Sequence, residues 1–492
     1  MDSQSIVAPG LSAKTRSEFL TELRNTTPGK PLDLLVIGGG ITGAGLALEA
    51  ASRGLTTVLI EKRDFGSGTS SRSTKLIHGG LRYLEHYDFA LVREGLLERA
   101  AIFEMAPHVA HPFPFIIPIY KSRSRNYDRP ILVRAGLILY DLLAGRYGIR
   151  RHHRISRDEA LARAPQLDSE GLQGAYVYYD GRTNDSRLVI DTIKTAHRYG
   201  ARIVNYASVQ SFFGAPQLDG ALIRDEFTGE LIRVHARSII NATGVWMNET
   251  RALAGPLPET DRQLRPSKGI HLTVPAERLK VESAWLIPAL GEHRFYFVVP
   301  WEDRVNIGTT DTDFTGDKDS PGALASEISQ ILDAINTFFP SADLTMNDVI
   351  SAWAGLRPLI SSGNSQVSST AVSRKEEIFE DSDGLISLAG GKLTTFRLMA
   401  ERGVDTALRR LSISPKSKPS QGRRLRLAGS GAVPSQTERE TLADTTGISK
   451  AVLDHLIEAY GSEYQAVLEI LSEKEEYRQQ LARDLPVIAA EV

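Results

Sequence analysis

The chain has 492 residues, which is too long for one ordinary hydrophobic core and predicts roughly two to four domains. Its formal net charge of -2 gives no global field for nucleic acid, and the absence of cysteine excludes disulfides, thiolate catalysis and Cys-ligated metal centres. Residues 1–30 lack the apolar core of a signal peptide, and no run of about 18 apolar residues marks a transmembrane helix.

The first part of the chain predicts a nucleotide-binding unit. Residues 15–24 favour a short helix after a loose N-terminal arm. Residues 33–62 follow the order strand, glycine turn, helix, strand, which is typical of the start of a doubly wound parallel sheet. An amphipathic helix is expected at 89–105, and a strand interrupted by prolines at 111–121.

The rest of the chain alternates between two kinds of sheet. Residues 172–248 return to the doubly wound pattern, whereas residues 265–311 alternate apolar and polar side chains between turns, as an antiparallel sheet does. A helix is expected at 322–340. A strand, a Gly-Gly turn and a long helix follow at 384–411, and charged helices at 438–483.

Gly38, Gly40 and Gly43 form a G-x-G-x-x-G turn between the first strand and helix. Gly38 allows a sharp turn, Gly40 lets a pyrophosphate approach the backbone, and Gly43 lets helix and strand pack closely. The helix N-terminus then offers free N–H groups to the phosphates. Glu61 ends the second strand 23 residues after Gly38, where its carboxylate would accept hydrogen bonds from a ribose and repel the 2′-phosphate of NADP.

Two later segments favour FAD over NAD. Residues 241–244 (Asn-Ala-Thr-Gly) close a strand with small side chains, which suits a backbone passing beneath a flavin nucleotide. Gly390, Gly391 and Lys392 stand between a strand and a long helix. The positive end of that helix, together with Lys392, would stabilise the negative N1–C2=O edge of a reduced flavin.

Six segments carry a family resemblance over roughly residues 15–485: DLLVIGGGITGAGLALEAASRGL, TSSRSTKLIHGGLRYLEHYDFALV, NATGVW, IGTTDTDFTGD, GLRPL and GGKLTTFR. In this order they resemble the aerobic, quinone-linked FAD-dependent glycerol-3-phosphate dehydrogenases, within the D-amino acid oxidase-like fold family. The resemblance implies an α/β fold with a doubly wound, Rossmann-like FAD-binding domain, an antiparallel-sheet substrate domain and a C-terminal helical cap.

The expected domains follow from this resemblance. Residues 1–32 would form the N-terminal arm and short helix, and 438–492 the helical cap, which would be incomplete because family members usually continue further. The FAD-binding domain would be discontinuous, the substrate domain would lie between its parts, and a linker would precede the cap. Their boundaries are 33–100, 172–248 and 362–411 for the FAD-binding domain, 101–171 and 249–361 for the substrate domain, and 412–437 for the linker.

The resemblance implies non-covalent FAD and no metal. The residues expected to hold the cofactor come from the glycine turn, the segment after the second strand, and the later glycine-rich turns. They are Gly38, Gly40, Ile41, Thr42, Gly43, Glu61, Lys62, Thr69, Ser70, Ser71, Lys75, Leu76, His78, Val209, Ala242, Gly244, Arg357, Gly391, Lys392, Leu393 and Thr394.

The resemblance also implies a substrate site rich in cations. A phosphate dianion needs several donors, and each guanidinium supplies two in fixed geometry. Glycerol 3-phosphate would lose hydride to flavin N5 while His271 takes the hydroxyl proton, or while Arg357 holds the oxygen as an alkoxide. The expected substrate-binding residues are Arg82, Tyr83, His271, Arg357, Arg374 and Lys392.

Members of the family pass electrons to a membrane quinone as peripheral proteins, so a cytoplasmic chain in contact with the membrane surface is expected. Related oxidases use oxygen and carry an extra insertion of several tens of residues, for which this sequence shows no room. Other readings stay open: a glycerol-3-phosphate oxidase, an amine or amino-acid oxidase of the same fold, or a flavin-carrying tRNA-modification protein. A homodimer also stays open, and nucleic acid is not an expected partner.

Overall fold

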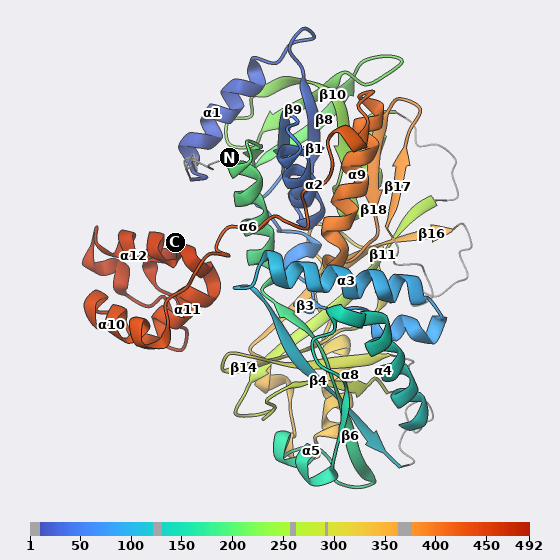
Figure 1. The fold of residues 1–492 in the computed structure, drawn as a ribbon, viewed down its shortest axis with the longest axis vertical. Helices are drawn as coiled ribbons and strands as arrows, with labels where there is room; N and C mark the ends of the chain where they lie inside the picture. The colour runs from blue at the N-terminus through green and yellow to red at the C-terminus, as the bar shows by residue number, and fades with distance from the viewer. Residues whose placement is uncertain (1–9, 122–129, 256–261, 291–293, 363–375) are drawn as a thin grey trace.

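The computed structural model describes residues 10–121, 130–255, 262–290, 294–362 and 376–492. Two β-sheets lie one above the other along the long axis, and a helical cap stands to one side (Figure 1). This is the mixed α/β arrangement expected from the sequence. Among the described residues, no helix is both long and apolar enough to cross a bilayer.

The upper sheet has eight strands with a parallel centre in the order β18-β10-β1-β2-β7. Strand β17 pairs antiparallel with β18, and the hairpin β8–β9 extends β10. The strands are β1 (Leu32–Ile37), β2 (Thr57–Ile60), β7 (Arg202–Val204), β8 (Ala207–Phe213), β9 (Gly220–Asp225), β10 (Leu231–Asn241), β17 (Glu377–Glu380) and β18 (Leu385–Ala389).

Both faces of the parallel centre are covered, because alternate side chains of a strand point to opposite faces. Leu34 and Val36 of β1 pack in one cluster with helices α2 (Ile41–Ser52), α6 (Asp185–Arg198) and α9 (Phe396–Arg410). Leu35 and Ile37 pack on the other side with the hairpin and helix α1 (Ala13–Arg24). Because both faces of β1 are buried, its apolar residues form a continuous run and do not alternate with polar ones.

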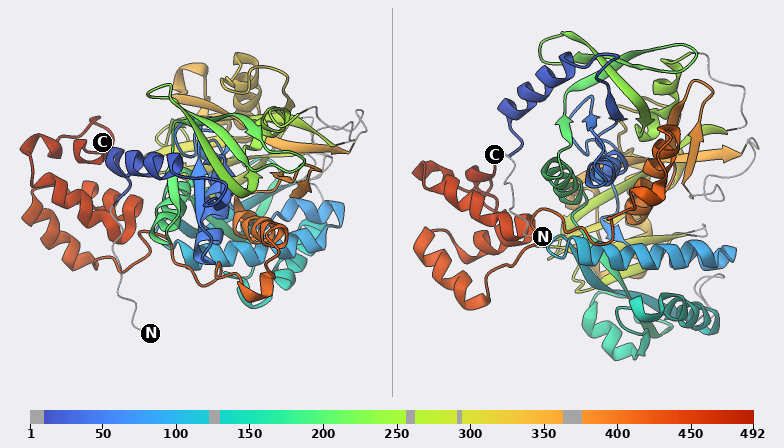
Figure 2. Two further views of the ribbon diagram at one scale, coloured as in Figure 1. Left: turned by 90° about the horizontal axis from the view of Figure 1, so that it is seen from above. Right: turned by 45° about the horizontal axis from the view of Figure 1, so that its top comes forward.

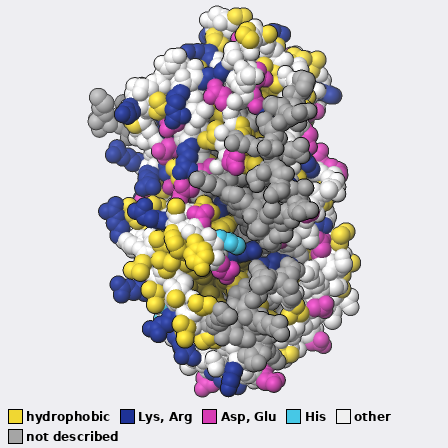
Figure 3. Space-filling model, turned by 90° about the vertical axis from the view of Figure 1, so that its right-hand side faces the viewer, with side chains coloured by type: hydrophobic (Ala, Val, Ile, Leu, Met, Phe, Trp, Pro, Cys, Tyr) yellow, Lys and Arg dark blue, Asp and Glu magenta, His cyan; other side chains and the backbone are white. Residues whose placement is uncertain are grey.

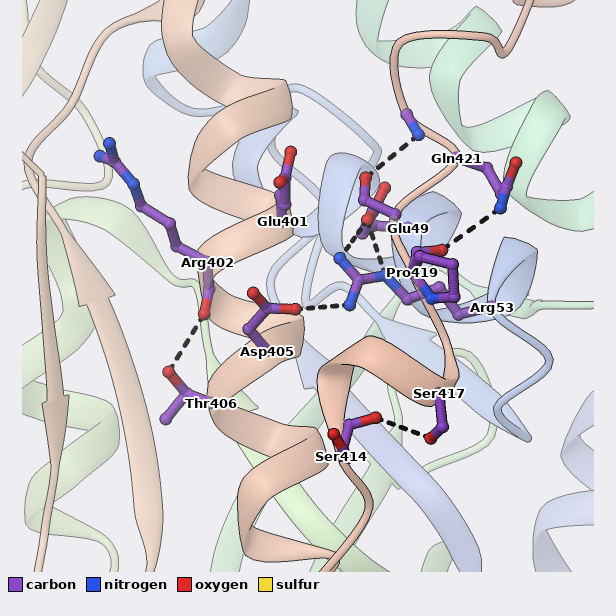
Figure 4. A network of polar contacts seen from close by, with 12 residues as sticks. Glu49, Arg53, Glu401, Arg402, Asp405, Thr406, Ser414, Ser417, Pro419 and Gln421 are labelled. Carbon is purple, nitrogen blue, oxygen red and sulfur yellow. Dashed lines mark hydrogen bonds and ion pairs between the residues drawn. The ribbon is translucent and has the colours of Figure 1, made fainter.

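The packing of α2 against α9 depends on small residues and on one buried arginine. Gly45 leaves room for Phe396, since a Cβ atom there would lie 2.9 Å from its ring. Arg53 forms ion pairs with Glu49 at 2.6 Å and with Asp405 of α9 at 2.5 Å (Figure 4). The two helices are therefore held together at the end of α2 away from the glycine turn.

The lower sheet has ten strands, in the order β15-β11-β14-β13-β12-β4-β6-β3, with β16 paired to β11 and β5 to β6. The strands are β3 (Leu76–Ile77), β4 (Ala110–Tyr120), β5 (His153–Ile155), β6 (Leu172–Thr183), β11 (Arg262–Pro275), β12 (Ala284–Pro288), β13 (Phe295–Trp301), β14 (Arg304–Gly308), β15 (Thr312–Asp313) and β16 (Ser351–Ser362). The α-helices outside the upper sheet and cap are α3 (Phe89–Met105), α4 (Pro130–Ala144), α5 (Arg157–Arg163), α7 (Met247–Ala252) and α8 (Ala325–Phe338).

Two strands lie in a different sheet from the one the sequence predicts. Strand β3, within the expected FAD-binding segment 33–100, pairs with β6 in the lower sheet. Strand β6, expected in the doubly wound segment 172–248, pairs along its length with β4 there. Its apolar run resembles a buried parallel strand, because both of its faces are covered. The doubly wound part of this segment begins with α6, at residue 185.

The segment 412–437 is packed and is more than a polar linker. Lys418 donates to the carbonyl of Arg53 at 2.9 Å, and the backbone N–H of Leu427 donates to the carbonyl of Met105. Leu425 and Leu427 are buried in the same cluster as α2. This segment leads to the cap, whose helices α10 (Gln436–Thr446), α11 (Lys450–Tyr460) and α12 (Tyr464–Leu471) enclose a core of their own (Figure 2).

Candidate active site

The carboxyl ends of four parallel strands meet at one edge of the upper sheet. β1 ends before Gly38, β2 before Glu61, β10 before Ala242 and β18 before Gly390. Residues that follow these strands line a cavity of about 350 Å³. Ligands of doubly wound sheets bind outside the carboxyl ends of the strands, so this edge is the expected nucleotide site.

The glycine turn fits tightly into its surroundings. Gly38 has a φ of 111°, and a Cβ atom there would lie 2.6 Å from the carbonyl oxygen of Ala242. Gly43 lies beneath the turn, where a Cβ atom would meet the carbonyl oxygen of Gly38 at 1.8 Å. Only glycine allows the helix to begin so close to the strand. Glu61 accepts a hydrogen bond from the N–H of Gly39 at 2.6 Å, which fixes the carboxylate beside the cavity.

Most residues expected at the cofactor line this cavity, and together they fit a dinucleotide. The turn supplies backbone close to the cavity, α2 starts there without a side-chain cap at Gly40, and Glu61 is in reach of a ribose. The expected residues that line it are Gly38, Gly40, Ile41, Thr42, Glu61, Lys62, Thr69, Ser70, Val209, Ala242, Gly244, Gly391, Lys392 and Leu393.

Three expected cofactor residues are not among those that line the cavities. Gly43 is covered by the turn, as described above, and Ser71 ends the short 3-10 helix that presents Thr69 and Ser70. The ammonium of Lys75 is 2.6 Å from the buried carboxylate of Asp185, and Lys75 is not among the residues that line either cavity. Direct contact of Lys75 with the flavin stays a prediction.

A second cavity of about 620 Å³ adjoins the first and shares Thr69, Ser70 and Lys392 with it. The lower sheet provides most of its other walls. The expected residues that line it are Leu76, His78, Arg82, Tyr83, His271, Arg357 and Thr394, and Gly391 and Leu393 are shared with the first cavity. Arg374 lies outside the described residues.

Two glycine-rich segments more than 300 residues apart form one wall of this cavity. The N–H of His78 donates to Oγ1 of Thr394 at 3.2 Å. The ammonium of Lys392 lies 3.8 Å from the centre of the Tyr83 ring. A cation at this distance from an aromatic face is stabilised by the ring, so the two segments are held side by side.

Arg357 lies on β16 and is held in place by the neighbouring strands. Its Nη2 donates to Oγ1 of Thr309 at 3.0 Å and to the carbonyl of Thr310 at 3.1 Å, and Nη1 is 3.4 Å from the carboxylate of Asp311. Gly269 on β11 makes room for it, because a Cβ atom there would lie 2.4 Å from Nη2. The guanidinium is thus oriented before any ligand arrives.

His271 lies on β11 and is buried against Trp353, with the rings stacked at 5.1 Å and tilted by 9°. Its Nε2 is 3.0 Å from Oγ1 of Thr74, and Nδ1 has no hydrogen-bond partner among the described residues. Burial, with smaller contributions from the charges of Arg357 and Lys75, lowers the pKa of His271 to about 3. The imidazole is therefore neutral near pH 7 and has a nitrogen that can accept a proton.

Several residues of the second cavity could not be predicted from the sequence. Thr309, Thr310 and Asp311 belong to the segment IGTTDTDFTGD, which contributed to the family resemblance but to which no role was given. Arg72 and Arg294 also line the cavity. Nothing in their local sequence separates these two arginines from solvated ones.

Asp180 is a buried acid in the wall of the second cavity. It pairs with Arg99 at 2.7 Å and accepts a hydrogen bond from the hydroxyl of Tyr140 at 2.8 Å. The N–H of Gly79 donates to the same hydroxyl at 2.9 Å. Burial raises the pKa of Asp180, and the charge of Arg99 opposes the rise. This network holds the Gly79–Gly80 turn that carries Arg82 and Tyr83.

Comparison with known families gives two matches. A profile described as "FAD dependent oxidoreductase" matches residues 33–401, and one described as "C-terminal domain of alpha-glycerophosphate oxidase" matches residues 420–492. The alpha-glycerophosphate oxidase of Enterococcus casseliflavus is 36% identical over 530 residues, which cover 94% of this chain and 86% of that protein. The oxidase of the same name from Streptococcus pneumoniae is also 36% identical, over 92% of this chain and 83% of that protein.

Solved structures show the same fold. The glycerol-3-phosphate dehydrogenase from Bacillus halodurans, complexed with FAD, superposes with a TM-score of 0.77 at 35% identity, covering 94% of this chain and 82% of that one. L-alpha-Glycerophosphate oxidase from Mycoplasma pneumoniae, with FAD bound, has a TM-score of 0.62 at 16% identity, over 77% and 94% of the two chains. The second likeness concerns the fold alone.

The buried His271 predicts a pH dependence of stability. The pKa of His271 is lowered from its usual value of 6.5 to about 3, so between these pH values the unfolded chain binds more protons than the folded one. Stability is therefore lost as pH falls through this window. Thermal unfolding of His271→Asn between pH 7 and pH 4 should lose less stability than the wild type, relative to each protein at pH 7. The exposed His153→Asn serves as control, and equal slopes for all three proteins would contradict the assignment.

Proposed function

The chain belongs to the family of FAD-dependent oxidoreductases, and we propose that it oxidises the secondary alcohol of glycerol 3-phosphate to dihydroxyacetone phosphate. One observation carries the proposal: Arg82, Arg357 and Lys392 line one cavity with His271, directly beside the nucleotide cavity. The names of the oxidases and of the dehydrogenase described above support the same substrate.

The cations of the second cavity suit a phosphate dianion. Arg82 lines this cavity, and a guanidinium there can donate two parallel hydrogen bonds to a phosphate. Arg357 is oriented by hydroxyl and carbonyl groups, and its nearest carboxylate is at the long distance of 3.4 Å. An amine or amino-acid oxidase would need one carboxylate-binding arginine and an apolar amine site, which this lining does not resemble.

We assign the first cavity to the ADP half of FAD and the shared wall to the flavin. Glu61 would bind the ribose, and the start of α2 the pyrophosphate. Thr69, Ser70 and Lys392 stand where the two cavities meet. When bound, FAD would supply the hydride acceptor for the substrate carbon, and the positive charge of Lys392 in the shared wall would stabilise its reduced form.

We propose His271 as the base that takes the hydroxyl proton. The neutral imidazole has a nitrogen free to accept, and a phosphate dianion in the same cavity would raise its pKa toward the range of a working base. In the alternative, no histidine takes the proton. The fixed guanidinium of Arg357 would stabilise the substrate's hydroxyl oxygen as an alkoxide, and the hydroxyl proton would leave to solvent.

For the electron acceptor we propose a membrane quinone, reached by peripheral contact of a cytoplasmic protein. The curated relatives described above are named oxidases, which favours oxygen. The alignment with the Enterococcus protein spans 530 positions, whereas 94% of 492 residues is about 462, so roughly 70 positions have no counterpart here. This difference supports the absence of the insertion expected in oxidases and hence the quinone.

Anaerobic mixing of the purified yellow holoenzyme with substrate tests the reaction. Glycerol 3-phosphate should bleach the flavin, because hydride transfer reduces it. Glycerol, which lacks the phosphate, and glycine should leave the absorbance unchanged at the same concentration. Bleaching by glycine but not by glycerol 3-phosphate would contradict the proposal.

Reoxidation of the bleached enzyme should be faster with a soluble quinone than with oxygen, and the reverse order would assign an oxidase.

Rapid mixing of His271→Asn with glycerol 3-phosphate tests the base. Removal of a general base should slow flavin reduction by about 10²- to 10⁴-fold, with flavin content unchanged. The exposed His153→Asn, on the outer strand β5, is the matched control and should reduce at the wild-type rate. An unchanged rate in His271→Asn would exclude His271 as the base and leave the alkoxide held by Arg357.

A further inference from the structure

We propose that residues 317–320, in the loop between β15 and α8, form a clasp over the nucleotide cavity that slows the release of FAD. Lys318 and Asp319 are its positioning residues, and they act through side chains that line the cavity. The inference rests on the proposed assignment of the first cavity to the ADP half of FAD, and it holds whichever alcohol the second cavity takes. Its support comes from the two ends of the clasp, their place around the glycine turn, and the anchoring of the loop.

Asp319 binds the segment that follows β2. Its carboxylate lies 2.9 Å from the ammonium of Lys62 and 3.4 Å from the guanidinium of Arg63. Nη1 of Arg63 also donates to the backbone carbonyl of Asp319 at 3.2 Å. Partial burial would raise the pKa of Asp319, but the hydrogen bond from Lys62 and the charges of Lys62 and Arg63 lower it below its usual value. The carboxylate is therefore charged near pH 7 and holds two residues of the cavity lining.

Lys318 binds the segment that follows β10. Its ammonium donates to the backbone carbonyl of Val245 at 2.9 Å and lies 2.5 Å from the carboxylate of Glu249. Trp246 stands between these two residues in the chain, and the centre of its ring lies 4.2 Å from the ammonium of Lys62. Trp246 and Glu249 line the nucleotide cavity, as Lys62 does. Two neighbouring residues of one loop thus bind two segments of the cavity wall that are more than 180 residues apart.

The two ends of the clasp lie on opposite sides of the glycine turn. Strand β1 stands between β10 and β2 in the upper sheet, and the turn at Gly38 follows β1. A loop that joins the segment after β10 to the segment after β2 therefore spans the sheet edge at the position of the turn. A nucleotide with its pyrophosphate at the start of α2 would lie between the clasp and the sheet edge. Its release would then require at least one end of the clasp to open.

The loop that carries the clasp is anchored in the lower sheet. At its start the N–H of Phe314 donates to the carbonyl of Pro266 at 3.0 Å, and at its far side Lys268 donates to the carbonyl of Gly322 at 3.2 Å. Pro266 and Lys268 both lie on β11, so the two sides of the loop are fixed to one strand. The loop is therefore held beside the cavity by contacts with the protein itself, and the clasp joins the lower sheet to the upper one across the cofactor site.

An exposed ion pair by itself indicates no function. Charged side chains of both signs are scattered over the face of the molecule that Figure 3 shows, and exposed pairs usually contribute little to stability. The pairs of Lys318 and Asp319 differ because together they close one loop over the cavity. The loss of either end should consequently have nearly the same effect on FAD release as the loss of both.

The rate of FAD release from the diluted holoenzyme, followed by the rise in flavin fluorescence, tests the clasp. Asp319→Asn should release FAD about two- to tenfold faster than the wild type, because exposed ion pairs to two cations are lost. Higher ionic strength should speed release from the wild type more than from Asp319→Asn, since the variant has no such pairs to screen. Glu230→Gln is the matched control and should release FAD as the wild type does. Glu230 and its partner Arg24 are 41% and 40% exposed, close to the 40% and 37% of Asp319 and Lys62, and Glu230 lines neither cavity.

The double variant Lys318→Met/Asp319→Asn distinguishes a clasp from two independent contacts. It should release FAD at about the rate of Asp319→Asn alone, because a loop freed at one end no longer closes the cavity. Single effects that multiply in the double variant, or an unchanged rate in Asp319→Asn, would overturn the clasp.

Glu61→Ala tests the cavity assignment separately, because Glu61 would bind the ribose directly. Faster release from Glu61→Ala, with Asp319→Asn as slow as the wild type, would overturn the clasp and leave the assignment in place. Wild-type release from Glu61→Ala would overturn the assignment and the clasp together.

Discussion

The contact between Lys392 and Tyr83 is the point on which the arrangement of the site depends. It joins the Gly-Gly turn after β18, in the upper sheet, to the turn after β3, in the lower sheet. Each turn follows a strand fixed by its own sheet, and the turn after β18 forms part of the wall that the two cavities share. The hydrogen bond between His78 and Thr394 reinforces the same junction. A cofactor bound along the upper sheet and a substrate bound on the lower one are thereby brought together.

The ionisable groups at this junction are partly or fully buried, and their lost hydration lowers the stability of the fold. Arg357 and Lys392 line a cavity together with a buried histidine whose pKa is lowered and with Asp180, a buried acid whose pKa is raised. Such groups are stable only when neighbouring polar groups compensate for the lost hydration. The pairing of Asp180 with Arg99 and Tyr140, and of Lys75 with Asp185, provides that compensation within the described residues.

Local sequence was a good guide to the nucleotide site and a weaker one to the substrate site. The turn at Gly38, Gly40 and Gly43 is a strong signal for nucleotide binding because its strand, turn and helix adjoin in the chain. The predicted bounds of that strand and helix agree with those of β1 and α2 to within a few residues. Strand β6 was assigned to the wrong sheet because an apolar run does not indicate which sheet buries it. Arg294 could not be found, since its place in the cavity depends on pairing between distant strands. The ion pair between Lys75 and Asp185 is likewise a tertiary contact.

The central claim is that a phosphate binds among Arg82, Arg357 and Lys392 beside the flavin. A crystal structure of the oxidised holoenzyme with dihydroxyacetone phosphate tests this directly, because that ligand has the phosphate but cannot donate a hydride. The account predicts phosphate oxygens within hydrogen-bond distance of at least two of these three cations, with the ligand carbonyl toward His271 and the flavin. Density for the phosphate outside the second cavity, with the three cations contacting only protein, would contradict it.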